Sequence, residues 1–309
     1  MIELFARSSR MREAVSLAER VSATASNVLI TGESGVGKDV LAAFIHARSA
    51  RFQQPFVKID CATLPGDLLE AELFGYERGA FTGANEAKPG RLEAANKGTV
   101  VLDEIAHLSV DAQAKLLRVI EEREFERLGG RSTLKLNARV IALTNVDLAE
   151  AVKRRGFRAD LFYRLNVVHI EVPPLREREE DLSQLVKHFI AHYATKHGRR
   201  ITGISSAALA ALRAYEFPGN ARELGNIVER AVIVSSVKRI EVDHLPPSLM
   251  AAVAAERKRL KPLSLAEIEA AYIAEMLVTT GGNKSECARV LGISRKNLYE
   301  KIAKYELKV

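Results

Sequence analysis

The clearest chemistry in this sequence is phosphate binding by residues 32–39, GESGVGKD. They follow an apolar run, Val28–Thr31, precede a helical pattern, and match G-x-x-x-x-G-K-[ST] up to the lysine. In such a loop the glycines let backbone N–H groups curl around a phosphate, the helix adds its positive dipole end, and Lys38 reaches the outer phosphates. A chance glycine-rich turn is the weaker alternative. The predicted phosphate-binding residues are Gly32, Glu33, Ser34, Gly35, Val36, Gly37, Lys38 and Asp39.

A second segment, GTVVLDE at 98–104, is an apolar run that ends in two acids. Asp103 would hold Mg²⁺, through water, and Glu104 would polarise the attacking water. An Asp-Glu pair after a strand is equally common as a helix N-cap, so the phosphate loop is what favours the catalytic interpretation. Asp39 stands where the general loop pattern has Ser or Thr, so the usual hydroxyl ligand of Mg²⁺ is missing.

A third segment, GAFTGA, fits neither a strand nor a helix. It consists of Gly79, Ala80, Phe81, Thr82, Gly83 and Ala84. A lone phenylalanine on a glycine-hinged loop is either buried in a turn or exposed for a partner. We expect an exposed tip.

The elements around these segments alternate between strand and helix. Strand-like runs occur at 28–31, 56–60, 99–103, 139–144 and 167–172, and helical patterns at 10–22, 39–47 and 111–121. Such alternation predicts an α/β fold, with a parallel sheet covered by helices on both faces.

The pattern changes after Pro173-Pro174. From about Asp181 to Val237 it is helical only, and Leu245–Leu263, with three prolines and a basic run, suggests a linker. We therefore expect an α/β core at 1–172, a helical subdomain at 173–245, a linker at 246–262 and a helical C-terminal unit at 263–309.

Composition narrows the class of protein. Hydrophobic residues make up 47% and charged residues 28% of the 309, which is typical of a globular protein. We expect no membrane partner and no export signal, because the apolar runs are short and the N-terminus lacks an apolar core. Cys61 and Cys287 lie far apart without metal-site spacing, which fits a cytoplasmic location. The net charge of +7 weakly indicates an anionic partner.

Taken in order, the phosphate loop, GAFTGA and LDE resemble the central domain of the NtrC-type bacterial enhancer-binding proteins. These are AAA+ ATPases that activate sigma-54 RNA polymerase, and the resemblance runs from about residue 5 to the end. It implies ATP and Mg²⁺ as cofactors and a homo-oligomer, dimers assembling into a hexameric ring. It also implies the sigma-54 holoenzyme as the partner, with Phe81 and Thr82 at the contact tip. An acid at Asp39 is usual in this family.

The resemblance extends to further positions. Thr144-Asn145 is similar to sensor I, which responds to the terminal phosphate. Arg158 and Arg164, in FRADLFYRL, resemble arginine fingers that reach the neighbouring subunit's nucleotide, although a solvated helix face is the plainer alternative. Arg222, in FPGNARELGN, resembles the sensor II arginine, which faces the nucleotide of its own subunit.

Two more segments carry family roles. RLGGRS at 127–132 matches the second surface loop, which supports GAFTGA. Asp60, in KIDCATL, stands where the family often has an asparagine that hydrogen-bonds the catalytic glutamate. An ionised aspartate cannot donate to Glu104, so we expect a different coupling between nucleotide and loops.

The C-terminal unit predicts three helices separated by turns. Asn283 with Glu286 would form a capping box, and Ser294 would cap the last helix. The expected inner positions are Leu265, Ile268, Tyr272, Met276, Cys287, Val290, Leu291, Leu298 and Ile302. The expected DNA-binding residues are Ser294, Arg295, Lys296, Asn297 and Lys301, of which the basic ones and Asn297 face out.

From Arg289 to the end, six Lys or Arg against two Glu give a net charge of +4. A basic outer face suits major-groove reading, and the segment resembles the Fis-type helix-turn-helix. A protein-docking module is the alternative on spacing alone. Self-pairing of the first helix would make the enhancer site a near-palindrome.

Together these features predict a sigma-54-dependent transcriptional activator bound to enhancer DNA. Two rivals stay open: a ligand-gated repressor of the same family that works with the ordinary sigma factor, and a DNA-binding protein with a vestigial nucleotide site. The phosphate loop begins about thirty residues in, so we expect regulation by a separate protein or by a longer chain.

Overall fold

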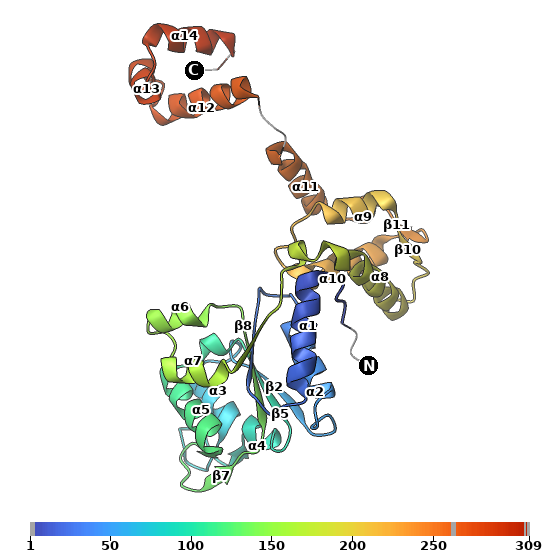
Figure 1. The fold of residues 1–309 in the computed structure, drawn as a ribbon, viewed down its shortest axis with the longest axis vertical. Coiled ribbons are helices and arrows are strands. Elements are labelled where there is room, and N and C mark those ends of the chain that lie inside the picture. The colour runs from blue at the N-terminus through green and yellow to red at the C-terminus, as the bar shows by residue number, and fades with distance from the viewer. Residues whose placement is uncertain (1–3, 261–263, 306, 308–309) are drawn as a thin grey trace. The chain divides into compact units, whose positions relative to one another are not determined.

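The computed structural model describes residues 4–260, 264–305 and 307, and it divides into two units, residues 1–249 and 250–309 (Figure 1). The α/β part of the first unit contains α1 Ser9–Ser22, β1 Val28–Thr31, α2 Lys38–Ala47, β2 Phe56–Asp60, α3 Gly66–Phe74, β3 Gly75–Tyr76, β4 Lys88–Pro89, α4 Arg91–Ala94, β5 Thr99–Asp103, η1 Ile105–His107, α5 Val110–Glu122, β6 Glu124–Glu126, β7 Thr133–Lys135, β8 Arg139–Thr144, α6 Leu148–Lys153, α7 Ala159–Leu165 and β9 Val168–Glu171.

The central sheet has the strand order β2-β5-β8-β1-β9, and its pairings are parallel. Along β5, Val101 enters one apolar core, whereas Val100 and Leu102 enter the core on the opposite face. Both faces are buried, which is why the inner strands are continuous apolar runs rather than alternating ones. The predicted parallel sheet is confirmed.

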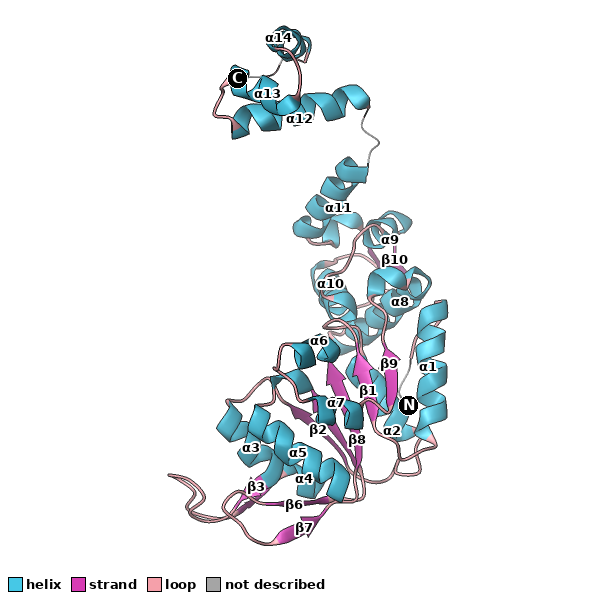
Figure 2. Ribbon diagram, turned by 60° about the vertical axis from the view of Figure 1, so that its left-hand side comes forward, coloured by secondary structure: helices cyan, strands magenta, loops and turns pink. Residues whose placement is uncertain are grey.

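Helices cover the two faces of this sheet (Figure 2). On one face, α1 and α2 pack together and contribute Ala18 and Ile45, each fully buried. The opposite core takes residues from α3, α5 and α7, such as Leu73, Leu116 and Leu161. The carboxyl ends of β1, β5 and β8 therefore meet at one edge of the sheet, where the predicted chemistry lies.

Two short antiparallel pairs, absent from the sequence-based prediction, carry the surface loops. β3 pairs with β4, and β6 pairs with β7. The first pair brackets residues 77–87, which include GAFTGA, and the second brackets 127–132. The loop after β3 leads away from the sheet (Figure 2).

The helical subdomain departs from the prediction, since it is not made of helices alone. β10 and β11 form a parallel pair within it. Strands of two residues are too short to give a period-2 pattern, which explains the error. Its elements are η2 Leu175–Glu177, α8 Glu179–Lys196, β10 Gly203–Ile204, α9 Ser206–Arg213, α10 Asn220–Val234, β11 Arg239–Ile240 and η3 Val242–His244.

The predicted linker is mostly a helix, α11 Pro247–Leu260. The proline cluster predicts a break, but Pro247 occupies the first helical position, where proline is favoured. The alanines and basic residues that follow are good helix formers.

The C-terminal unit has the predicted three helices, α12 Leu265–Thr279, α13 Lys284–Leu291 and α14 Arg295–Lys304. Asn283 Oδ1 accepts from the backbone N–H groups of Ser285 and Glu286, and Ser294 Oγ accepts from that of Asn297. Both predicted N-caps are confirmed. The capping box is wrong, because the Glu286 carboxylate pairs with Arg289 instead of its own helix start.

The inner face of α12 differs from the prediction at Tyr272, whereas Met276 packs against the core as predicted. Ile273 and Leu277 are buried, whereas Tyr272 is 52% exposed, and on α13 Val290 is half exposed. The side chains of Leu265 and Ile268 lie outside the described residues. Cys287, Leu298 and Ile302 pack inward as predicted.

Lys301 does not face outward. Its Nζ lies 2.5 Å from Glu269 Oε1 on α12. Arg295, Lys296 and Asn297 are exposed on the first turn of α14, as predicted. The outward face of α14 is thus smaller than expected.

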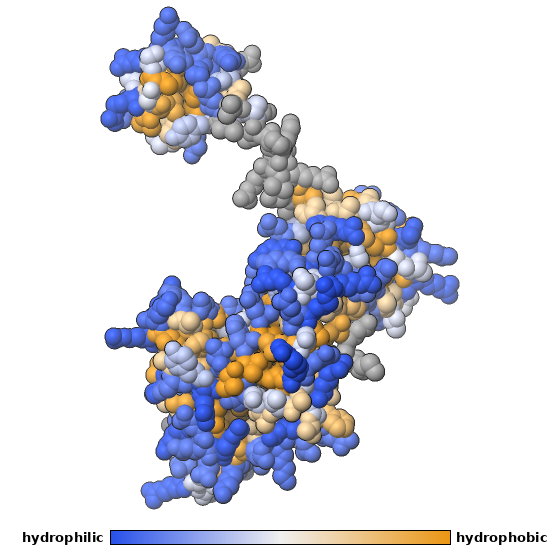
Figure 3. Space-filling model, in the orientation of Figure 1, coloured by the Kyte–Doolittle hydropathy of each residue, from blue (hydrophilic) through white to orange (hydrophobic). Residues whose placement is uncertain are grey.

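Hydrophilic residues cover most of the visible face of both units (Figure 3). Within the described residues, no helix is both long enough and apolar enough to span a bilayer.

Candidate active site

The phosphate loop joins β1 to α2, as its sequence predicts. Gly35 (φ +78°) and Gly37 (φ +102°) have left-handed backbones, and a Cβ on Gly35 would lie 2.4 Å from the carbonyl oxygen of Gly219. Glycine is therefore required at position 35 by both conformation and space. The loop leaves its amides at the N-terminus of α2, where an anion is favoured.

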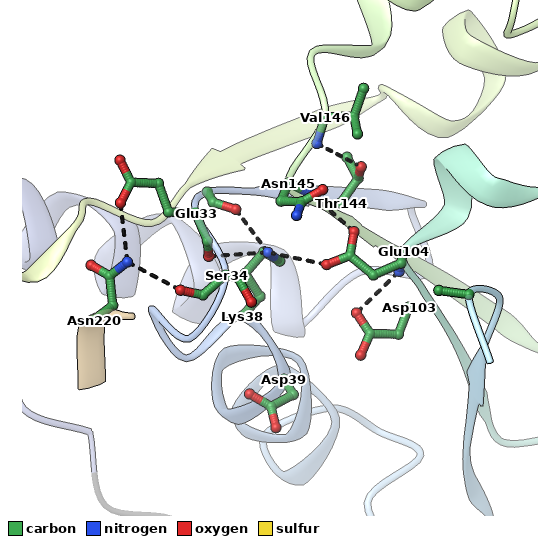
Figure 4. A network of polar contacts seen from close by, with 12 residues as sticks. Glu33, Ser34, Lys38, Asp39, Asp103, Glu104, Thr144, Asn145, Val146 and Asn220 are labelled. Atoms are coloured by element: carbon green, nitrogen blue, oxygen red, sulfur yellow. Dashed lines mark hydrogen bonds and ion pairs between the residues drawn. The ribbon is translucent and has the colours of Figure 1, made fainter. Parts of the chain in front are cut away.

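Lys38 is buried at the start of α2 and curls back over the loop. Its Nζ donates to the carbonyl oxygens of Gly32 at 2.7 Å and Glu33 at 3.2 Å, and lies 3.8 Å from Glu104 Oε1 (Figure 4). Burial lowers the pKa of Lys38, against the opposing effect of the Glu104 and Asp103 carboxylates. A positive charge held in this position is suited to phosphate oxygens.

Glu104 follows β5 with a left-handed backbone (φ +52°). Glutamate rarely adopts this conformation, and such strain is characteristic of functional sites. Its Oε2 accepts from the Asn145 backbone N–H at 3.2 Å, and Oε1 faces Lys38. The predicted water-polarising carboxylate thus lies between the phosphate loop and the end of β8.

The predicted sensor I pair lies at the end of β8, where Thr144 is the last strand residue and Asn145 follows it. Thr144 is fully buried, and its Oγ1 accepts from the Val146 N–H at 3.0 Å, so the hydroxyl stabilises its own turn. Asn145 is exposed, and its N–H holds Glu104.

Arg222 approaches the same cleft from α10. Its Nη1 donates to Ser34 Oγ at 2.8 Å. The cleft lies between the sheet edge and the helical subdomain, and its lining includes Ser34, Gly35, Gly37, Lys38, Asp39, Lys58, Asp103, Glu104, Phe189, Tyr193, Arg222 and Gly225.

The GAFTGA loop is closed by its own backbone. The Gly79 N–H donates to the Ala84 carbonyl at 2.9 Å, and the Ala84 N–H to that of Phe81 at 3.0 Å. Ala84 is buried and Thr82 is exposed. Phe81 is 42% exposed, with its ring 5.0 Å from that of Tyr76. The tip is therefore partly supported rather than fully buried or fully free.

The second surface loop packs directly behind this one. A Cβ on Gly129 would lie 2.9 Å from Ala80 Cβ. At the base, Arg127 holds both Glu93 Oε2 (2.8 Å) and Glu77 Oε1 (3.0 Å). The contact fits the supporting role that the resemblance implies for residues 127–132.

Comparison with known families gives a match for each part of the chain. Residues 4–171 match the sigma-54 interaction domain, 176–262 the AAA+ ATPase lid domain, and 264–305 the bacterial regulatory protein, Fis family. The chain belongs to the NtrC-type family of sigma-54-dependent regulators. The lid match includes the whole predicted linker, residues 246–262.

Related proteins are similar in sequence to nearly the whole chain. Regulatory protein AtoC of Escherichia coli K12 is 45% identical over 93% of this chain and 64% of its own length. Transcriptional regulatory protein FlbD of Caulobacter vibrioides is 42% identical over 97% and 69%. A crystal structure of NtrX from Brucella abortus in complex with ADP has a TM-score of 0.73 and 34% identity, over 99% of this chain and 69% of that one. The chain thus spans less than two thirds of AtoC.

The two predicted arginine fingers, Arg158 and Arg164, do not line the chain's own cleft in the described residues. Arg158, just before α7, pairs with Asp160 at 2.7 Å. Arg164 is exposed on α7, and its carbonyl accepts from Asn27 Nδ2 at 3.0 Å. In the described part of the chain, neither lines the cleft that contains Lys38.

The side chains of Glu33 and Val36, two of the predicted phosphate-binding residues, are engaged elsewhere. The Glu33 carboxylate turns to the lid, where it accepts two bonds from Arg176 (2.7 and 3.0 Å) and one from Asn220 Nδ2 (3.0 Å). The hydrogen bonds from Arg176 lower the pKa of Glu33. Val36 is 3% exposed, inside the core, so only its backbone can reach a phosphate.

Two residues that sequence reasoning missed complete the site. Asn220 is buried with φ +54° and joins the loop to the lid. Its one signal was its place in FPGNARELGN. Lys58 on β2 extends its Nζ to 2.7 Å from Asp103 Oδ2 and 3.9 Å from Asp39 Oδ2. Its signal was a position two residues before Asp60, on the strand beside β5.

Proposed function

We propose that this chain is an ATPase that remodels the closed complex of sigma-54 RNA polymerase through its GAFTGA loop while it is bound to enhancer DNA. The observation that carries the proposal is the pairing of an assembled nucleotide cleft with a half-exposed GAFTGA tip on one unit. The chain from Asp60, at the cleft edge of the sheet, leads through α3 to that loop. A short path therefore connects the nucleotide to the tip.

In the proposed reaction, Lys38 and the loop amides bind the phosphates, and Arg222 approaches from the lid. Glu104 polarises the water that attacks the terminal phosphate. The Asn145 N–H fixes the Glu104 carboxylate in position, which a water-orienting base requires.

The residues present fit Mg²⁺. The carboxylates of Asp103 and Asp39 both face the Lys58 ammonium, so the space between them already accommodates a positive charge. Oxygen ligands are the ones that Mg²⁺ prefers, and Asp103 would hold it. Bound Mg²⁺ would neutralise charge that develops on the phosphates.

The arginines beside α7 are proposed to act across a subunit interface, because they lie away from their own cleft. Arg164→Ala and Lys38→Ala are each expected to lose at least about 100-fold in ATP hydrolysis. Mixing the two inactive proteins is expected to restore part of the rate, because some sites then combine an intact loop with an intact neighbouring arginine. Steady-state phosphate release measures the rates of the two single variants and of their mixture.

The control is Arg154→Ala, an exposed arginine directly after α6 that pairs with Glu150, and it is expected to keep the native rate. A mixture that stays inactive would mean that Arg164 acts in its own subunit or not at all.

The test of the whole proposal is open-complex formation at a sigma-54 promoter with ATP. The native chain is expected to open the promoter and Thr82→Ala to lose at least about ten-fold, since it removes the exposed hydroxyl at the tip of a contact loop. Thr195→Ala, an exposed threonine on α8, is the matched control. Permanganate footprinting reports the open DNA. If the native chain hydrolysed ATP without opening the promoter, the proposed action on sigma-54 RNA polymerase would be rejected. The ligand-gated repressor would then be favoured.

The C-terminal unit is proposed to bind enhancer DNA. Arg295, Lys296 and Asn297 form the exposed first turn of the second helix of a helix-turn-helix, the position from which such helices read base edges. Lys301, held by Glu269, is a weaker candidate than its sequence position implied. A homodimer would bind a near-palindromic enhancer site. We propose a cytoplasmic location for the protein.

A further inference from the structure

Lys58 stands where the nucleotide site should carry a metal ion. It lies on β2, an edge strand of the central sheet, and its side chain is 40% exposed. The nearest carboxylates come from two other elements, Asp103 at the end of β5 and Asp39 in the first turn of α2. The Nζ–Oδ2 distances are 2.7 Å to Asp103 and 3.9 Å to Asp39.

A third carboxylate adds to the negative charge. Asp60 follows Lys58 by two residues, so both side chains lie on one face of β2, and Asp60 is in register with Asp103. Asp60 Oδ1 accepts from the Ala62 N–H at 2.9 Å, which keeps its carboxylate at the end of the strand. Without a cation, three carboxylates gathered at this edge would repel one another.

The phosphate-loop lysine makes no ion pair with Asp103, Asp39 or Asp60 in the described part of the chain. Lys38 Nζ is committed to the carbonyl oxygens of Gly32 and Glu33 and faces Glu104. Among the described residues, Lys58 is the cation that forms an ion pair with Asp103. An ammonium on a four-carbon, partly exposed stem can also swing away without disturbing the core.

We propose that Lys58 is a tethered counter-ion at the metal position, a positioning residue that holds Asp103 and Asp39 before nucleotide binds and yields its place to the Mg²⁺ that arrives with ATP. The inference rests on the proposed ATPase function. Lys58 Nζ and a metal ion cannot both lie beside Asp103 Oδ2, because two cations at that separation repel strongly. The free metal must therefore compete with a tethered charge, whereas a metal already bound to phosphates brings its own neutralising ligands.

The consequence is a site that discriminates against bare metal ions. Native protein without nucleotide should bind divalent cations weakly, although its carboxylates are well placed. The metal then enters as part of a metal–nucleotide complex rather than as free Mg²⁺.

The experiment titrates nucleotide-free protein with Mn²⁺, following the electron paramagnetic resonance signal of the free ion. Lys58→Met removes the charge and keeps the length of the side chain, and it is expected to bind Mn²⁺ at least about ten-fold more tightly than native protein. Lys58→Arg keeps the charge and is expected to bind as weakly as native. The control, Lys115→Met, removes a lysine of similar exposure that pairs with Glu70, and should change nothing.

A second variant places the effect at the proposed atoms. Adding Asp103→Asn to Lys58→Met is expected to cancel the gain in Mn²⁺ affinity. Equal Mn²⁺ affinity in native and Lys58→Met protein would overturn the inference, and so would a gain that survives Asp103→Asn.

Binding of a fluorescent ATP analogue with Mg²⁺ to native protein separates this inference from the function on which it rests. If native protein binds the Mg²⁺–nucleotide complex and Lys58→Met has the Mn²⁺ affinity of native protein, only the proposed role of Lys58 is rejected. The proposed ATPase function then stands. No binding of the Mg²⁺–nucleotide complex by native protein rejects both.

Discussion

Glu104→Gln is expected to bind ATP with near-native affinity and to hydrolyse it at least about 100-fold more slowly, the scale typical of a lost general base. The amide has the size of the carboxylate, and its oxygen can still accept from the Asn145 N–H, so the geometry should persist. It cannot take a proton from water. Single-turnover hydrolysis of labelled ATP, with nucleotide binding measured separately, divides the two effects.

The control is Glu70→Gln, which changes a glutamate of similar exposure on α3 that pairs with Lys115. It should hydrolyse ATP at the native rate. If Glu104→Gln kept more than half of the native single-turnover rate, Glu104 would not be the base. If it instead lost ATP binding, the carboxylate would serve mainly to balance the charge of Lys38, which lies 3.8 Å away.

The sequence predicted those parts of the site that depend on where strands end. Lys38, Glu104 and Asn145 each follow a strand of the same parallel sheet, and parallel strands bring their carboxyl ends to one edge. Motif spacing along the chain was therefore enough to bring them together. The inner strands were also predictable, because burial on both faces makes them continuous apolar runs.

Features that depend on long-range pairing were missed. Lys58 meets Asp103 only because β2 lies beside β5, and Asn220 meets Glu33 only because the lid folds back across 187 residues. Neither pairing leaves a periodic pattern in the sequence. The inner face of α12 was misplaced for another reason: its sequence is rich in alanine and apolar all round, so Tyr272 and Ile273 fit the pattern equally well.

Asn220 is the residue that ties the phosphate loop to the lid. Its Oδ1 accepts from the Leu175 N–H at 2.8 Å, and its Nδ2 donates to Glu33 Oε2 and to the Ser34 carbonyl, both at 3.0 Å. The side chain is fully buried, and its left-handed backbone suits asparagine. One amide therefore holds the strand-to-lid connection and the loop in fixed relation.

Removing this amide should lower the free energy of unfolding and weaken nucleotide binding. Asn220→Gly keeps the backbone conformation and leaves the buried Leu175 N–H without its acceptor, so we expect a loss of about 1–3 kcal/mol in the free energy of unfolding. Asn220→Ala adds the strain of a left-handed alanine, about 1 kcal/mol more. Urea unfolding of both variants measures the two contributions, and ATP affinity should fall in parallel because the loop loses its attachment to the lid.

Asn226→Ala, on the exposed side of the same helix, is the control for stability and should unfold like native protein. Equal losses in the Gly and Ala variants would mean that the hydrogen bonds alone matter and that the backbone relaxes. Native ATP affinity in an Asn220→Gly protein of reduced stability would show that other contacts, such as Glu33–Arg176 and Arg222–Ser34, are enough to hold the lid to the loop.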